Sequence, residues 1–242
     1  MNDLESRLHP RKAIQEHLLR GEIAEVLEMA GMLHGHYCPG LALGVKAVEC
    51  GFSALGIADN TGMEEVMAVA ECNNCFVDGV QFAAGCSLGN NALVYQDLGK
   101  TAVTLYRRTG GEAVRLCVTS FEVEAVSEER RGEGDELFDK AVKRREKLSE
   151  EESRRMKELW IERSFAVATM PADTLFTQSR RPAPRFAYAP ILDSQECGMC
   201  GEKVMESKAG FRNGSPVCAS CGGLQFPMVL GKGIVTAGAA PI

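Results

Sequence analysis

Two imidazoles and one thiol lie within residues 34–40, in the stretch His-Gly-His-Tyr-Cys-Pro-Gly. Proline is favoured at the first position of a helix, so Pro39 predicts a helix that begins there and places Cys38 at its cap. Unpaired backbone N–H groups at a helix start favour the thiolate, which is the form that binds a metal or attacks an electrophile. His34, His36 and Cys38 are therefore the first half of a candidate site, and a buried cysteine beside two surface histidines is the plainer alternative.

A second group of polar side chains follows about forty residues later in the chain. Cys75, Asp78 and Gln81 are spaced by three, so a helix that starts near Cys75 places them along one face. That face looks either into water or into a cleft. Cys86 lies in the Gly- and Asn-rich stretch 85–91, which predicts a loop whose backbone approaches a ligand, or a plain turn.

The C-terminal part carries the most specific pattern in the sequence. Two C-x-x-C pairs, separated by seventeen residues, consist of Cys197, Cys200, Cys218 and Cys221. This spacing predicts a tetrathiolate zinc site with a structural role, because four thiolates leave no open coordination position. A rubredoxin-like iron centre is the alternative. Asn213-Gly214 predicts a β-hairpin between the two knuckles. Such a module binds nucleic acid, binds protein or braces a dimer, and the pattern does not choose among these.

Composition limits the function classes. The chain has 242 residues and a formal net charge of −6, which argues against broad binding to a phosphate backbone, so nucleic acid is an unlikely partner. No apolar stretch is long enough for a signal peptide or a membrane span, so we expect a cytoplasmic protein without a membrane partner. In a reducing compartment the ten cysteines then indicate metal ligands or reactive thiols rather than disulfides.

Helices are expected before and after residues 34–40. Apolar residues recur at helical spacing over residues 14–32, with Gly21 as an interruption. The helix from Pro39 is expected to fray between Gly51 and Gly56. An apolar run over residues 66–70 predicts a buried strand that leads to the second polar group.

β-rich runs over residues 92–95, 101–107 and 112–119 predict an antiparallel sheet. A charged region over 134–163 predicts two helices that break at Ser149, where a capping-box pattern occurs. A further strand is expected over 174–177, and residues 180–185 have the composition of a linker. We therefore expect a core domain over 1–180, a linker over 181–192, and a finger with a tail over 193–242.

The spaced motifs resemble one family. HGHYCPGLAL at 34–43, ECNNCFVDGVQ at 71–81, GCSLGNNAL at 85–93, DLGK at 97–100 and the four-cysteine finger resemble the FmdE family, proteins related to the FmdE component of formylmethanofuran dehydrogenase. The resemblance implies an α+β fold, with helices packed on an antiparallel sheet and a small treble-clef or zinc-ribbon-like finger. It also implies a homodimer and a shared cleft lined by His36, Cys38, Cys75, Asp78, Gln81 and Cys86. Cys72 and Gly79 depart from the family's usual residues.

The leading hypothesis is a cytoplasmic metal-binding protein that serves a molybdenum or tungsten one-carbon enzyme, such as formylmethanofuran dehydrogenase of methanogens. A divalent metal, with zinc as the first candidate, would bind through His36, Cys38 and Cys75 and keep a fourth position open. Asp78 would accept a proton or orient a ligand, with His34 nearby. The alternatives are a thiol enzyme that uses Cys38 or Cys75 as the attacking thiolate, and a non-enzymatic adaptor that uses the finger.

Overall fold

The computed structural model describes residues 3–120, 123 and 125–238. The chain divides into two compact units, Met1–Arg185 and Phe186–Ile242, which are described separately below. Residues 239–242 of the expected C-terminal tail lie outside the described residues. In the part that the structure describes, every helix is too short or too polar to span a bilayer.

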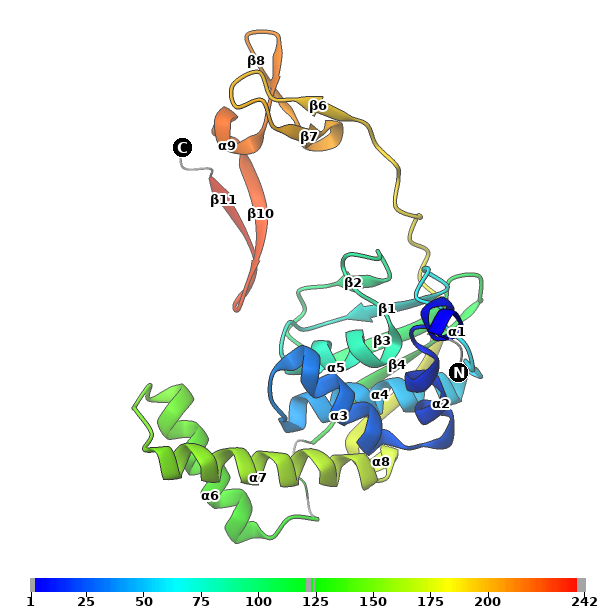
Figure 1. Ribbon diagram of the computed structural model, residues 1–242, viewed down its shortest axis with the longest axis vertical. Coiled ribbons are helices and arrows are strands. Elements are labelled where there is room, and N and C mark those ends of the chain that lie inside the picture. The colour runs from blue at the N-terminus through cyan, green and yellow to red at the C-terminus, as the bar shows by residue number, and fades with distance from the viewer. Residues whose placement is uncertain (1–2, 121–122, 124, 239–242) are drawn as a thin grey trace. The chain divides into compact units, whose positions relative to one another are not determined.

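The first unit is built on a five-stranded sheet with the strand order β2-β1-β3-β4-β5 (Figure 1). Its strands are β1 (Val66–Ala70), β2 (Leu93–Tyr95), β3 (Ala102–Arg107), β4 (Glu112–Val118) and β5 (Phe176–Pro182). The predicted α+β class is confirmed, and the β1–β3, β3–β4 and β4–β5 pairs are antiparallel. The expectation for the strand at 92–95 was wrong, because β2 runs parallel to β1. A helix crosses over between these two strands, as a parallel connection requires.

Helices cover one face of this sheet (Figure 1). The helices of this part are α1 (Asp3–Leu8), α2 (Lys12–Arg20), α3 (Ile23–His34), α4 (Pro39–Leu55) and α5 (Cys75–Ala84). Of these, α4 and α5 pack on the strands, and α2 and α3 pack on other helices. The predicted break at Gly21 is confirmed, since this residue ends α2 with a φ of 69°. The predicted start at Pro39 is also confirmed. Gly51, however, lies inside α4, which ends at Gly56. Glycine at position 51 allows the helix to pack closely on the sheet, since a Cβ there would come within 2.5 Å of Leu105 Cδ1.

Helices α4 and α5 approach each other closely where they cross. A Cβ on Gly44 would lie 2.1 Å from the Phe76 carbonyl oxygen, and one on Gly79 would lie 2.2 Å from the Leu41 carbonyl oxygen. Glycine at both positions therefore lets the two backbones touch, which no larger residue would allow without separating the helices. This crossing brings the N-terminal ends of α4 and α5 together, and these ends carry Cys38 and Cys75.

A helical pair follows the sheet hairpin. It consists of α6 (Glu128–Phe138), a π-helical turn η1 (Asp139–Lys143) and α7 (Glu150–Thr169). The predicted break at Ser149 is confirmed, since its side chain and that of Glu152 form a reciprocal capping box. The first helix begins earlier than expected because the Ser127 side chain caps it. α7 packs against α3 and α4 of the first unit (Figure 1).

The end of the first unit differs from the sequence-based expectation. Residues 172–175 form a short helix, α8 (Ala172–Leu175), and the strand starts only at Phe176. Residues 180–182, which have the composition of a linker, are the last residues of β5 and pair with β4 as far as Pro182. An edge strand needs only one hydrogen-bonded side, so it tolerates the exposed arginines and the proline of this stretch.

The second unit is a small finger followed by a β-ribbon. Its elements are β6 (Ser194–Glu196), β7 (Lys203–Met205), η2 (Glu206–Lys208), β8 (Gly210–Arg212), β9 (Ser215–Val217), α9 (Ala219–Gly222), β10 (Gln225–Leu230) and β11 (Gly233–Gly238). The predicted Asn-Gly hairpin is confirmed: Asn213 and Gly214 have φ values of 51° and 80° and join β8 to β9. A knuckle, a hairpin and a short helix agree with the expected zinc-finger-like element.

Candidate metal centre

Cys38 and His34 meet because one helix ends and the next begins around a short loop. His34 is the last residue of α3, and Gly35 ends that helix with a φ of 85°. Cys38 caps α4, and its Sγ accepts a hydrogen bond from the Leu41 backbone N–H at 3.4 Å. The turn brings His34 Nε2 to 3.6 Å from Cys38 Sγ. An imidazole nitrogen and a cysteine sulfur are thereby placed side by side.

His36 completes a three-residue cluster. One ligand atom from each of His34, His36 and Cys38 lies within 4.8 Å of the other two. The two imidazole rings are tilted by 38°, with centroids 4.3 Å apart. Partial burial, reinforced by the charge of His34, lowers the pKa of His36 and favours the neutral imidazole that ligates metals.

Cys75 reaches this cluster from α5. It is the first residue of that helix, which Asn74 caps through a hydrogen bond from the Phe76 backbone N–H. A Cβ on Gly40 would lie 3.1 Å from Cys75 Cβ and 3.9 Å from Cys38 Sγ, so only a glycine separates the two cysteines there. The Cys38 thiol donates to Cys75, which lowers the pKa of Cys75 to about 6 and raises that of Cys38. The pair therefore supplies one thiolate readily.

Asp78 contacts His34, and Gln81 contacts Asp78. The His34 Nδ1–H donates to Asp78 Oδ2 at 2.7 Å, and Gln81 Nε2 donates to Asp78 Oδ1 at 3.3 Å. Both residues come from α5, one and two helical turns after Cys75, as their spacing predicted. A carboxylate on Nδ1 fixes the imidazole tautomer and leaves Nε2 free to bind a metal.

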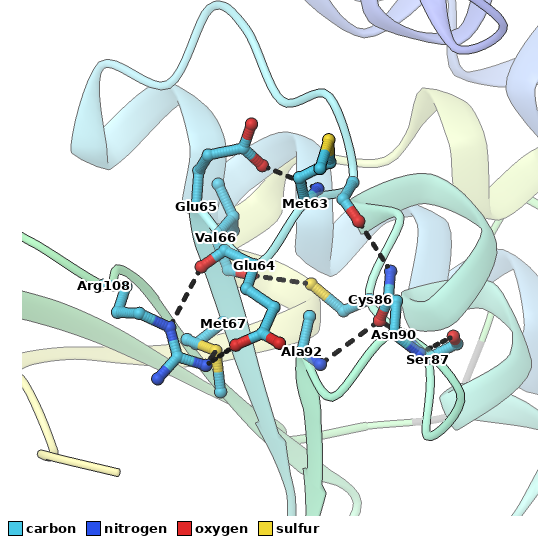
Figure 2. Close-up of polar contacts among 11 residues, drawn as sticks. Met63, Glu64, Glu65, Val66, Met67, Cys86, Ser87, Asn90, Ala92 and Arg108 are labelled. Carbon is cyan, nitrogen blue, oxygen red and sulfur yellow. Dashed lines mark hydrogen bonds and ion pairs between the residues drawn. The ribbon is translucent and has the colours of Figure 1, made fainter. Parts of the chain in front are cut away.

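Cys86 does not join the other expected cleft residues. Its fully buried thiol donates instead to the Val66 carbonyl oxygen of β1 at 3.3 Å (Figure 2). Burial raises the pKa of this thiol to about 12. Asn90 holds the loop around it, because its side chain accepts from the Ser87 and Ala92 N–H groups and donates to the Gly62 carbonyl oxygen. The stretch 85–91 is therefore a fixed structural turn, and Cys86 is a core residue.

Two features of the site were not predicted from the sequence. His34 was expected in the cleft but not among the metal ligands, and one of its ligand atoms lies within 4.8 Å of those of His36 and Cys38. Trp160 of α7 stacks beside His36, with ring centroids 5.8 Å apart. The first had a weak signal in its position four residues before Cys38. The second had none, because Trp160 and His36 lie in distant parts of the chain.

The donor set of the core cluster fits a divalent metal. Two imidazoles and two neighbouring thiols are nitrogen and sulfur donors of the kind that zinc prefers. The His34–Asp78 hydrogen bond is the outer contact that metal-bound histidines usually make. The structure therefore places candidate nitrogen and sulfur ligands close together, and the half-exposed carboxylate of Asp78 contacts His34.

The finger holds a second candidate metal site. The four sulfur atoms of Cys197, Cys200, Cys218 and Cys221 lie within 4.8 Å of one another. The Cys218 backbone N–H donates to Cys197 Sγ at 3.4 Å, which is the main cause of a lowered Cys197 pKa of about 6. The Cys221 N–H donates to Cys218 Sγ at 3.5 Å. Four thiols so arranged fit one tetrahedral ion with no open position.

Comparisons with known proteins identify related chains. Residues 33–177 match the profile of a protein family described as FmdE, molybdenum formylmethanofuran dehydrogenase operon. The chain is 36% identical over 219 residues to a probable S-adenosyl-L-methionine-binding protein of Archaeoglobus fulgidus. That alignment covers 89% of this chain but only 57% of the relative. The crystal structure of a tungsten formylmethanofuran dehydrogenase FmdE-like protein from Syntrophus aciditrophicus is similar, with a TM-score of 0.49, 22% identity and coverage of 83% of this chain and 92% of that one.

Proposed function

The chain belongs to the FmdE family, and we propose that it binds a divalent metal, with zinc as the first candidate, in the core cluster of His34, His36 and Cys38. Cys75 is the neighbouring thiol that completes the donor set. One observation carries this proposal: one possible ligand atom from each of three residues at the junction of α3 and α4 lies within 4.8 Å of the other two. In this assignment His34 joins the predicted ligands His36, Cys38 and Cys75.

Each residue of the site has a separate task in this proposal. Asp78 holds the Nδ1–H of His34, so that Nε2 faces the ligand cluster. The hydrogen bond from the Cys38 thiol lowers the pKa of Cys75, which favours the thiolate at Cys75. A bound zinc ion would supply a Lewis acid at any coordination position that the protein leaves open. Asp78, which is 39% exposed, is the carboxylate that would accept a proton there.

Metal content of the purified protein tests the proposal. The finger and the core site together predict two zinc ions per chain. Replacing Cys38 and Cys75 with alanine should remove one of them, and replacing Cys197 and Cys200 should remove the other. One zinc per chain in the wild type, unchanged by the core replacements, would leave only the finger and contradict the core site.

We further propose that the protein is cytoplasmic, forms a homodimer and is an accessory to a molybdenum or tungsten one-carbon enzyme. The family description, which refers to the molybdenum formylmethanofuran dehydrogenase operon, supports this role. The finger would bind a structural zinc ion and would either brace the dimer or bind the partner enzyme. Affinity purification of the intact chain should then recover a molybdenum or tungsten dehydrogenase, and deletion of residues 196–222 should release it. Purification of the intact chain without such an enzyme would contradict the accessory role.

A thiol enzyme is the second candidate, because Cys38, His34 and Asp78 lie in the order of nucleophile, base and orienting carboxylate. Their contacts are 3.6 Å between Cys38 Sγ and His34 Nε2 and 2.7 Å between His34 Nδ1 and Asp78 Oδ2. Alkylation with iodoacetamide separates the two functions. A metal-bound thiolate is protected until a chelator is added, whereas a free reactive thiolate is alkylated rapidly below neutral pH without chelator.

A further inference from the structure

Trp160 lies between the candidate metal site and helix α6. Its ring is tilted by 34° to that of His36, with centroids 5.8 Å apart. On the α6 side its ring contacts Phe138, with centroids 5.5 Å apart. The three rings thus form a continuous contact from α6 through α7 to the loop that carries His36.

The same loop is attached to α7 at a second point. The ring of Tyr37 packs against Phe165, with centroids 5.3 Å apart. On its other side Tyr37 lies against α3, where a Cβ on Gly31 would come within 2.6 Å of its ring. The loop between α3 and α4 is therefore held between these helices and α7, and both His36 and Tyr37 contact aromatic residues of α7.

The two histidines of the cluster are oriented by different means. The His34 ring is fixed by its hydrogen bond to Asp78. Neither ring nitrogen of His36 has a hydrogen bond within the part of the chain that the structure describes, so ring contacts with His34 and Trp160 set its orientation. An imidazole held by stacking keeps both nitrogens available, and its orientation depends on the ring beside it.

We propose that Trp160 is a positioning residue for the core metal site: its indole holds the His36 imidazole beside His34 and Cys38, so that α7 controls one metal ligand. Phe138 supports the indole from α6. This inference rests on the proposed metal-binding function and adds a residue that contacts no metal itself.

A double-mutant cycle tests the inference. Cobalt affinity of the core site is measured in the intact chain by its visible absorption bands, with the finger already loaded with zinc. Trp160→Ala should weaken binding roughly tenfold, within the range for residues that orient a metal ligand. Trp160→Phe should retain nearly wild-type affinity. In a His36→Ala background, Trp160→Ala should cause no further loss, because the ligand that it positions is gone.

Fluorescence gives a second readout that a general loss of stability would not mimic. Trp160 is the single tryptophan of the chain, so its emission reports on this contact alone. Cobalt at the core site should quench it in the wild type and much less in His36→Ala. Ile161→Ala, at a neighbouring position of α7 that is 42% exposed, is the matched control and should change neither affinity nor quenching.

The possible failures are distinguishable. If the wild type binds no cobalt outside the finger, the proposed function and this inference both fall. If the wild type binds cobalt but Trp160→Ala binds it equally well, only the inference is overturned. The same holds if the losses from Trp160→Ala and His36→Ala simply add, since Trp160 would then act through stability rather than through His36.

Discussion

His34 Nδ1 donates a hydrogen bond to Asp78 Oδ2 at 2.7 Å, although 44 positions separate the two residues in the chain. The side chain of His34 is 9% exposed and that of Asp78 is 39% exposed. The contact joins the end of α3 to the first turns of α5 and links the two groups of polar residues that the sequence keeps apart. It leaves His34 Nε2 directed at Cys38, 3.6 Å away.

Replacement of Asp78 with asparagine should weaken zinc binding at the core site by about 10- to 100-fold, the usual effect of losing an outer carboxylate. Asn keeps the size of the side chain but removes the charge that fixes the His34 tautomer. Competition with a chromophoric chelator measures the affinity. Asp59→Asn is the control, because Asp59 is 84% exposed and contacts only Arg107 among the ion pairs of the described residues. Equal affinities for both variants would show that Asp78 does not orient the ligand.

A second prediction concerns the buried ion pair of Glu71 and Arg115. Arg115 Nε and Nη2 donate to the two carboxylate oxygens of Glu71 at 2.6 and 2.7 Å, and the Glu71 side chain is 6% exposed. Glu71→Gln should destabilise the core by about 3 kcal/mol, because it leaves a guanidinium poorly compensated. Glu112→Gln, at an ion pair that is half-exposed on both sides, should cost less than about 1 kcal/mol. Urea unfolding measures both, and similar losses would contradict the assignment.

The same pair predicts a pH dependence. The hydrogen bonds from Arg115 lower the pKa of Glu71 in the folded state. The unfolded state then binds more protons than the folded state as the pH falls, so stability rises with pH in this range. The contribution should be complete above the unfolded pKa of about 4.3 and be lost as the pH drops through the lower folded pKa. The difference in unfolding free energy between wild type and Glu71→Gln, measured from pH 7 to pH 3, should shrink towards the acid end.

The helix crossing that brings Cys38 to Cys75 can be tested with a matched pair of glycines. Gly44→Ala places a Cβ 2.1 Å from the Phe76 carbonyl oxygen, so α4 and α5 must separate, and we expect a loss of about 3 kcal/mol. Gly132→Ala in α6 meets no atom within 4 Å and should instead stabilise by roughly 0.5–1 kcal/mol, through helix propensity. Thermal unfolding followed by circular dichroism measures both. A tolerated Gly44→Ala would mean that the helices need not touch there.

Metal removal should destabilise the finger but not the first unit. The finger has few buried side chains, with Cys197 and Val217 as its fully buried apolar residues in the described part, so its fold depends on the ion. The first unit has an extensive apolar core. A strong chelator should therefore make residues 194–222 sensitive to proteases while residues 3–120 stay protected. Equal resistance of the finger with and without chelator would contradict its metal dependence.

Local sequence signals predicted several element boundaries in both units. Pro39 and the Ser149 capping box each fixed a helix start through contacts within four residues, and both starts are present in the structure. Asn213-Gly214 fixed a hairpin because its turn needs two positive φ values. These features depend on the backbone of a few consecutive residues, which is why the sequence alone predicts them.

Features that depend on packing between distant segments were not predictable in the same way. Cys86 shares its residue type and its neighbourhood in the chain with Cys75, yet its thiol points into the core and donates to Val66 of β1, while Asn90 ties its loop to Gly62. The parallel pairing of β2 follows from the crossover after β1 rather than from residues 92–95. The contact of Trp160 with His36 depends on where α7 packs, and a charged helix gives little indication of that.

X-ray anomalous scattering at the zinc edge, on crystals of the intact protein, tests the central claim most directly. We expect one peak among Cys197, Cys200, Cys218 and Cys221 and a second among His34, His36 and Cys38, with Cys75 adjacent. The second peak should disappear in crystals of the Cys38→Ala, Cys75→Ala variant, while the first remains. A single peak in the finger of the wild type, with the core cluster free of metal, would contradict the proposed core site.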